Sequence, residues 1–137
     1  QKTKECLIYK ARYFMHPEMV EKLSVITDEE QEILDGQKNI NKELYTEKKE
    51  LVVDCQKLLE KGKLISLRTH TRFVYFPKHR HNYVEVIYMC QGSTRHIING
   101  NEVLLKQGDL LFLNQSATQE ILPAGEGDIA INFIVLP

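Results

Sequence analysis

The chain has 137 residues, 42% of them hydrophobic, which is enough for one hydrophobic core and too short for two domains of ordinary size. Its 18 basic and 19 acidic side chains give a formal net charge of -1, so long-range attraction of a polyanion is excluded and we expect no nucleic-acid binding by these residues alone. No apolar run approaches the roughly 20 residues of a membrane span, and no signal-peptide apolar region opens the chain.

The first 62 residues, called the lead-in below, have apolar side chains at helical spacing. Thr27 and Glu30 form a capping-box pattern and Asp35-Gly36 is a stop signal, so we expect a short helix between them. A longer helix is expected over 46–61, ended by Gly62. Its apolar stripe would consist of Leu51, Val52, Cys55, Leu58 and Leu59. This stripe would pack on the following domain or, alternatively, form a subunit contact.

After the lead-in, residues 63–137 read as a succession of strands at roughly eight-to-twelve-residue spacing. The expected strands are 65–76, 83–91, 94–98, 102–105, 109–113, 118–122 and 129–135. Asn99-Gly100 is the strongest hairpin signal, because both central residues of a tight turn must accept positive φ. Turns are also expected at 107–109 and 123–128. The pattern predicts a mainly β sandwich or barrel that forms one globular unit with the short N-terminal helices.

The motif His79-Arg80-His81, followed by Glu85 and Gly92, is the most informative stretch of the chain. Alternate side chains of an extended strand share a face, so His79, His81 and Glu85 can converge on one interior. Two imidazoles and a carboxylate suit a divalent transition metal. Alternatively, the histidines form hydrogen bonds inside the barrel or line a pocket for an organic ligand. The pattern leaves these two interpretations open.

The same motif resembles the first cupin motif, and the segment Gly108-Asp109-Leu110-Leu111-Phe112-Leu113-Asn114 resembles the start of the second. Cupins are double-stranded β-helix (jelly-roll) barrels, in agreement with the expected strands. Residues 64–137 are most similar to the N-terminal effector-binding domain of AraC-type bacterial transcription regulators, through His70-Thr71-Arg72-Phe73 and Phe76-Pro77 as well as the second motif. The resemblance implies that an effector binds inside the barrel, usually without a metal.

The chain departs from the cupin pattern at four positions. Phe73 stands where the pattern has glycine, Asn114 where it has proline and Ser116 where it has glycine. The histidine that usually serves as fourth metal ligand falls on Gln119, whose carbonyl oxygen is a weaker ligand for zinc-like ions. The resemblance therefore implies a tentative metal set of His79, His81, Glu85 and Gln119, and we expect no cofactor to be held tightly.

Other polar residues are candidates for the barrel interior. Asn132 is a lone amide in an apolar strand, and a buried amide needs a partner, which a ligand or a neighbouring strand end could supply. Arg72 could bind a carboxylate or sugar hydroxyls, or be a solvated strand residue. Tyr83, Tyr88 and His96 are weaker candidates that could equally pack in the core or on the surface.

Three functions follow from these observations. The first is the effector-sensing domain of an AraC-type regulator, in which a sugar or other metabolite enters the barrel and alters how attached DNA-binding helices are presented. No helix-turn-helix fits within these residues, so DNA binding would require a domain beyond Pro137. The second is a small metal-dependent cupin enzyme, an isomerase, lyase or dioxygenase. The third is a structural or dimerisation module.

The sequence also leads to expectations about cellular location and oligomeric state. Cys6, Cys55 and Cys90 are widely separated and lack CxxC spacing, which favours a reducing compartment and structural thiols. We therefore expect a cytoplasmic protein without membrane contact. A homodimer is expected because two-fold assemblies are the commonest and suit palindromic DNA sites. The identity of the effector and the sign of the response are not encoded in these patterns.

Overall fold

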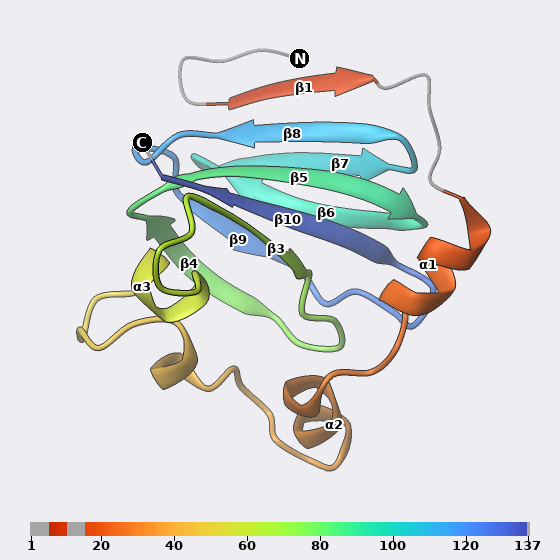
Figure 1. Ribbon diagram of the computed structural model, residues 1–137, viewed down its shortest axis with the longest axis horizontal. Coiled ribbons are helices and arrows are strands. Elements are labelled where there is room, and N and C mark those ends of the chain that lie inside the picture. The colour runs from red at the N-terminus through yellow and green to blue at the C-terminus, as the bar shows by residue number, and fades with distance from the viewer. Residues whose placement is uncertain (1–5, 11–15, 137) are drawn as a thin grey trace.

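The computed structural model describes residues 6–10 and 16–136 (Figure 1). The helical elements are α1 (Pro17–Leu23), α2 (Asp28–Leu34), the 3-10 helix η1 (Lys42–Leu44) and α3 (Cys55–Leu58). The strands are β1 (Cys6–Lys10), β2 (Val52–Val53), β3 (Ile65–Thr69), β4 (Phe76–His81), β5 (Val84–Gln91), β6 (Ser93–Ile98), β7 (Asn101–Lys106), β8 (Asp109–Leu113), β9 (Gln119–Ile121) and β10 (Ile129–Val135). No helix of the described ranges is long and apolar enough to cross a membrane.

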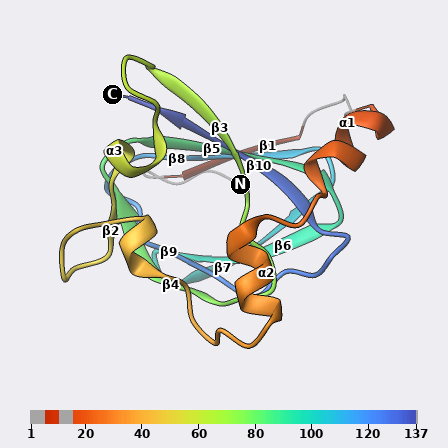
Figure 2. The ribbon, with the colours of Figure 1, turned by 60° about the horizontal axis from the view of Figure 1, so that its bottom comes forward.

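The strands form two five-stranded sheets that face each other. One has the order β1-β8-β5-β10-β3 and the other β2-β4-β9-β6-β7, and all pairings are antiparallel except that of β2 with β4. Figure 2 shows the two sheets as upper and lower layers, with β2 and α3 closing one side. The prediction of a mainly β, jelly-roll architecture with short N-terminal helices is confirmed.

One part of the space between the sheets is filled by aliphatic side chains. We call this the apolar cluster: Ile87, Met89, Leu105, Leu111 and Leu113, all with exposed fractions of 1% or less. These positions alternate along β5, β7 and β8, since every second residue of a strand points to the same face. The hydrophobic contribution of burying each such side chain is about 1.5–3 kcal/mol.

The local turn and cap signals are confirmed. Asn99 and Gly100 both have positive φ, 50° and 83°, in the hairpin between β6 and β7. Thr27 caps α2 in a full capping box with Glu30. Gly92 also requires its residue type, because φ is 73° and an added Cβ would lie 2.3 Å from Asp128 Oδ1. None of the three cysteines, all of them in the described ranges, forms a disulfide.

The predicted long helix over 46–61 is wrong. Only Cys55–Leu58 is helical, and Val52–Val53 form strand β2 beside Arg80 and His81 of β4. The Asp54 side chain accepts a hydrogen bond from Gln56 N and begins α3 there, after an extended segment. β-Branched valines suit that strand, and Leu51 and Val53 are buried at a strand period of two rather than at helical spacing.

Other boundaries also differ from those expected. The strand predicted over 65–76 ends at Thr69, and a separate strand β4 begins at Phe76. Between them Phe73 has a φ of 73°, a left-handed conformation that costs a non-glycine residue roughly 1–2 kcal/mol. Strand β1 and helix α1 were not anticipated. Because β1 pairs with β8 and β2 with β4, the lead-in adds a strand to each sheet.

Candidate functional site

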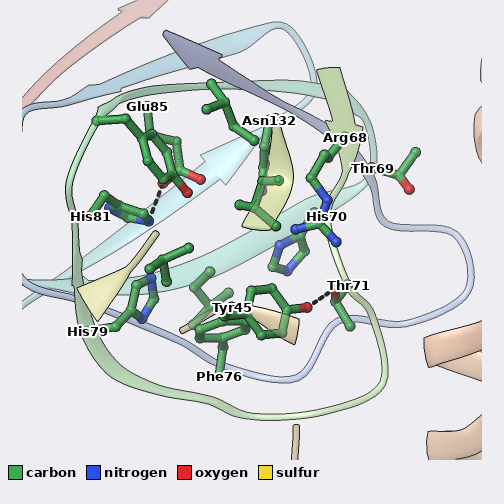
Figure 3. A pocket seen from close by; sticks show the side chains of 15 residues that line it. Tyr45, Arg68, Thr69, His70, Thr71, Phe76, His79, His81, Glu85 and Asn132 are labelled. Carbon is green, nitrogen blue, oxygen red and sulfur yellow. Dashed lines mark hydrogen bonds and ion pairs between the residues drawn. The ribbon is translucent and has the colours of Figure 1, made fainter. Parts of the chain in front are cut away.

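A partly open cavity lies between the sheets, on the side of the lead-in (Figure 3). Its volume is about 30 Å³, with room for roughly two water-sized groups. Strands β3, β4, β5, β9 and β10 line it, together with Tyr45, Val53 and Leu58 of the lead-in. Its polar lining includes Arg68, His70, His79, His81, Glu85 and Asn132. The strand parity of β4 and β5 explains why both histidines and Glu85 point inward.

The structure brings His79, His81, Glu85 and Gln119 together. His81 Nε2 lies 3.1 Å from Glu85 Oε2, and Gln119 Nε2 lies 3.3 Å from the same oxygen. Gln119 Nε2 is also 3.4 Å from His79 Nε2. All four residues are at most 4% exposed. With His70 and Asn132 they form what we call the polar cluster.

Hydrogen bonds set the orientation of the Gln119 amide. His79 Nδ1 lies 2.7 Å from Pro77 O and must donate to it, so His79 Nε2 is an acceptor and faces the Gln119 NH₂ group. The Gln119 carbonyl oxygen instead accepts from His96 Nδ1 at 2.8 Å. His96 Nε2 then accepts from Thr94 Oγ1 at 2.7 Å. The predicted fourth ligand therefore presents an amide nitrogen, not an oxygen, to His79 and Glu85.

This arrangement does not fit a bound metal ion. Gln119 turns donor hydrogens toward Glu85 and His79, where a cation would need lone pairs. Within the described ranges, no group of three or more histidine, cysteine, aspartate or glutamate side chains is placed to hold a metal. In this structure His79, His81, Glu85 and Gln119 form a hydrogen-bonded set, and their role as metal ligands stays a prediction.

Burial disfavours the charged forms of the ionisable groups around the cavity. It lowers the pKa of His70 and His81 to about 3 and the pKa of His79 and His96 to about 4. Burial also raises the pKa of Glu85. His81 Nε2 and Glu85 Oε2, 3.1 Å apart, form a hydrogen bond, and in the neutral imidazole one ring nitrogen of His81 carries a hydrogen while the other is an acceptor.

Three buried polar atoms lack a hydrogen-bond partner within the described ranges, and all three belong to the cavity lining. They are His70 Nε2, His81 Nδ1 and Asn132 Oδ1. An unsatisfied buried donor or acceptor costs about 1–3 kcal/mol, and more than 90% of such groups in proteins are paired. A polar group from outside the chain, such as a water molecule or a ligand, would offer these atoms a partner.

Arg72 does not line the cavity, and its predicted role as a ligand-binding residue is corrected. Its guanidinium forms a buried ion pair with Glu30, with Nε 2.7 Å from Oε2, and donates to the carbonyl oxygens of Ser24 and Glu126. Arg72 is 2% exposed, so it is not a solvated strand residue either. These bonds join α2 to the barrel and leave the guanidinium unavailable to a ligand.

Several lining residues were not identified from the sequence, among them Arg68, His70 and Tyr45. Arg68 and His70 are two residues apart on the segment predicted as a strand, so strand parity could have placed them on one face. Tyr45 had no such signal, because its place depends on tertiary contacts: its hydroxyl donates to Glu29 and lies 3.1 Å from Thr71 Oγ1. Of the weaker candidates, Tyr83 lines the cavity, and His96 and Tyr88 do not.

Known proteins with similar structures share the fold. Acireductone dioxygenase from Bacillus anthracis, with a cadmium ion in its active centre, has a TM-score of 0.51 and 16% identity over 96% of this chain and 78% of that one. A cupin protein from Bacteroides fragilis has a TM-score of 0.42 and 22% identity over 53% of this chain, which spans 63% of that protein. At these identities the likeness to the dioxygenase concerns the fold alone.

Comparison by sequence identifies the family. No curated protein matches the chain. The family model described as the AraC-like ligand binding domain matches residues 64–134, the segment that supplies every strand of the cavity lining except β2. The chain therefore belongs to the AraC-like ligand binding domain family.

Proposed function

We propose that this chain is the effector-sensing part of an AraC-type transcription regulator and that it binds a small hydroxylated molecule in the cavity of the polar cluster. One observation carries the proposal: three partnerless atoms, His70 Nε2, His81 Nδ1 and Asn132 Oδ1, belong to residues that line the same cavity. A hydroxyl group can donate to Asn132 Oδ1 and can pair with His81 Nδ1 as either donor or acceptor, so a polyol or sugar suits them. DNA would be bound by a separate domain.

The lead-in supplies a route from ligand to response. Tyr45, Val53 and Leu58 line the cavity, whose volume of about 30 Å³ is far below the roughly 300 Å³ of a typical small-molecule site. A ligand larger than a few atoms must therefore displace lining side chains. In our proposal the lead-in is displaced, which shifts the balance between two arrangements of the domain. A homodimer and a cytoplasmic location remain predictions.

The proposal is tested with Asn132→Leu, which removes a partnerless acceptor at similar volume. Wild type and variant are heated with a panel of sugars, polyols and sugar acids. We expect at least one compound to raise the Tm of the wild type with rising concentration, because a ligand that binds only the folded state stabilises it. The variant should lose this shift while being at least as stable without ligand. Equal shifts in both proteins, or no shift with any compound, would contradict the proposal.

A further inference from the structure

Arg68, which lines the cavity, lacks the ion pair with a glutamate that the other described arginines form. Arg72, Arg80 and Arg95 form ion pairs with Glu30, Glu50 and Glu102 respectively. Arg68 forms no ion pair within the described ranges, and its guanidinium carbon lies 5.4 Å from the centre of the Tyr45 ring. Arg68 is only partly buried and lines the cavity.

Strand register places two of the three residues with partnerless atoms, Asn132 and His70, beside this cation. Arg68 is directly opposite Asn132 in the β3–β10 pair, and directly opposite residues have Cβ atoms about 4.5–5.5 Å apart. His70 follows two residues later on the same face. Figure 3 shows Arg68 and His70 on one side of the cavity, His81 and Glu85 on the other, and Asn132 between them.

We infer that the ligand of this site is a hydroxylated monocarboxylate, with its carboxylate on Arg68 and an adjacent hydroxyl group between Asn132 and His81. This inference rests on the proposed function and specifies its ligand. A guanidinium presents a planar fork of donors that matches a carboxylate, whereas a neutral polyol would leave the charge of Arg68 without a counter-charge. His70 Nε2 lies on the same side and can add a third donor when that nitrogen is protonated.

The space around Arg68 fits such a molecule. The cavity, with room for roughly two water-sized groups, matches the two oxygens of a carboxylate. A groove of about 600 Å³ lies alongside and shares lining with the cavity, so Arg68 stands where the two meet. The shared residues are Leu58, Arg68, Thr69 and Thr71.

The groove disfavours a second negative charge. Three carboxylates line it, those of Asp28, Glu29 and Glu60, against the cations of Lys57 and Arg68. Glu29 accepts hydrogen bonds from the Tyr45 and Thr71 hydroxyls. Its carboxylate is held by these bonds and forms no ion pair with Arg68. The part of the ligand that extends into the groove should therefore be neutral and hydroxylated.

The test compares matched probes that differ in one group. D-gluconate and D-glucitol share a six-carbon chain and differ only in carboxylate against CH₂OH, and lactate and propane-1,2-diol form a smaller pair of the same kind. Dissociation constants are measured at fixed ionic strength for wild type, Arg68→Gln and Arg95→Gln. The last variant removes a cation from an exposed ion pair on β6 and serves as the matched control.

We expect the acid of a pair to bind the wild type at least about tenfold more tightly than its neutral partner. Arg68→Gln should abolish that preference, and Arg95→Gln should retain it. If the neutral partner binds as tightly as the acid, the inference fails while the proposed function stands. If neither member of any pair binds, both fail.

A second measurement does not depend on the folding of Arg68→Gln. In the wild-type protein, the Nε–H resonances of Arg68 and Arg95 are followed by NMR during titration with D-gluconate. A saturable shift of the Arg68 resonance, with the Arg95 resonance unchanged, supports the inference. Equal shifts of both resonances, or none at Arg68, overturn it.

Discussion

The apolar cluster and the polar cluster lie between the same two sheets, and strand β5 contributes to both. Its Ile87 and Met89 pack among aliphatic side chains, whereas Glu85, two residues before Ile87, points into the cavity with the histidines. The polar cluster holds all three partnerless atoms found in the described ranges.

This difference shows how one barrel divides its interior between stability and binding. Aliphatic side chains lower the free energy of the folded state wherever they are buried. Partnerless polar groups raise it, and they are retained where a partner from outside compensates.

A buried polar group with full partners should matter to stability as much as the apolar cluster does. Arg72→Met leaves the Glu30 carboxylate buried without its cation, and we expect a loss of about 3–5 kcal/mol in the free energy of unfolding. Urea unfolding measures this. The double variant Arg72→Met/Glu30→Gln removes both charges and should recover part of the loss. A double variant no more stable than the single one would refute this account of the pair.

Acidification should destabilise the polar cluster. Four of the five histidines are buried with folded pKa values of about 3 to 4, while in the unfolded chain they titrate near 6.5. Below pH 6.5 the unfolded state binds more protons, so stability falls as pH falls, by about 1.4 kcal/mol per histidine and pH unit. Glu85 acts in the opposite direction, because its raised pKa adds stability as pH falls.

We therefore expect a net loss of about 3–5 kcal/mol between pH 7.5 and pH 5.5. Urea unfolding across that range measures it. His70→Gln should reduce the loss by about 1 kcal/mol. A pH-independent free energy of unfolding would show that the histidines are not held neutral.

The two clusters should respond oppositely to substitution. Leu111→Ala creates a hole among fully buried aliphatic side chains and should cost about 2–5 kcal/mol. Asn132→Leu in the polar cluster should cost nothing or add about 1 kcal/mol, because it removes an unsatisfied acceptor. Leu64→Ala, at a residue that is 71% exposed, is the control and should change stability by less than about 0.5 kcal/mol. Equal losses at Leu111 and Asn132 would erase the contrast.

The smallest effect concerns the backbone between β3 and β4. Phe73 has a φ of 73° where the cupin pattern has glycine. Phe73→Gly and Phe73→Ala both remove the ring, but only glycine relieves the left-handed conformation, so the glycine variant should be more stable than the alanine variant by about 1 kcal/mol. Thermal unfolding of the two variants measures the difference. An alanine variant of equal stability would mean that the backbone relaxes at this position.

Much of the fold was predictable because it depends on local signals. The Asn99-Gly100 hairpin, the Thr27 capping box and the alternation along β5 each arise from residues adjacent in sequence. The same alternation brought His79, His81 and Glu85 to one interior. The helix predicted over 46–61 failed because its apolar stripe also fits a strand followed by one helical turn, and pairing with β4 decided between them.

The sequence by itself determined the barrel and which side chains face its interior, because turn geometry and strand parity are local properties. Tertiary structure decided which polar groups find partners. Arg72 is satisfied by Glu30, 42 residues away, while Arg68 is left without an ion-pair partner in the described ranges, and Gln119 is turned by contacts with His79 and His96. Whether a polar side chain is satisfied depends on groups far away in the chain, and no local pattern encodes that.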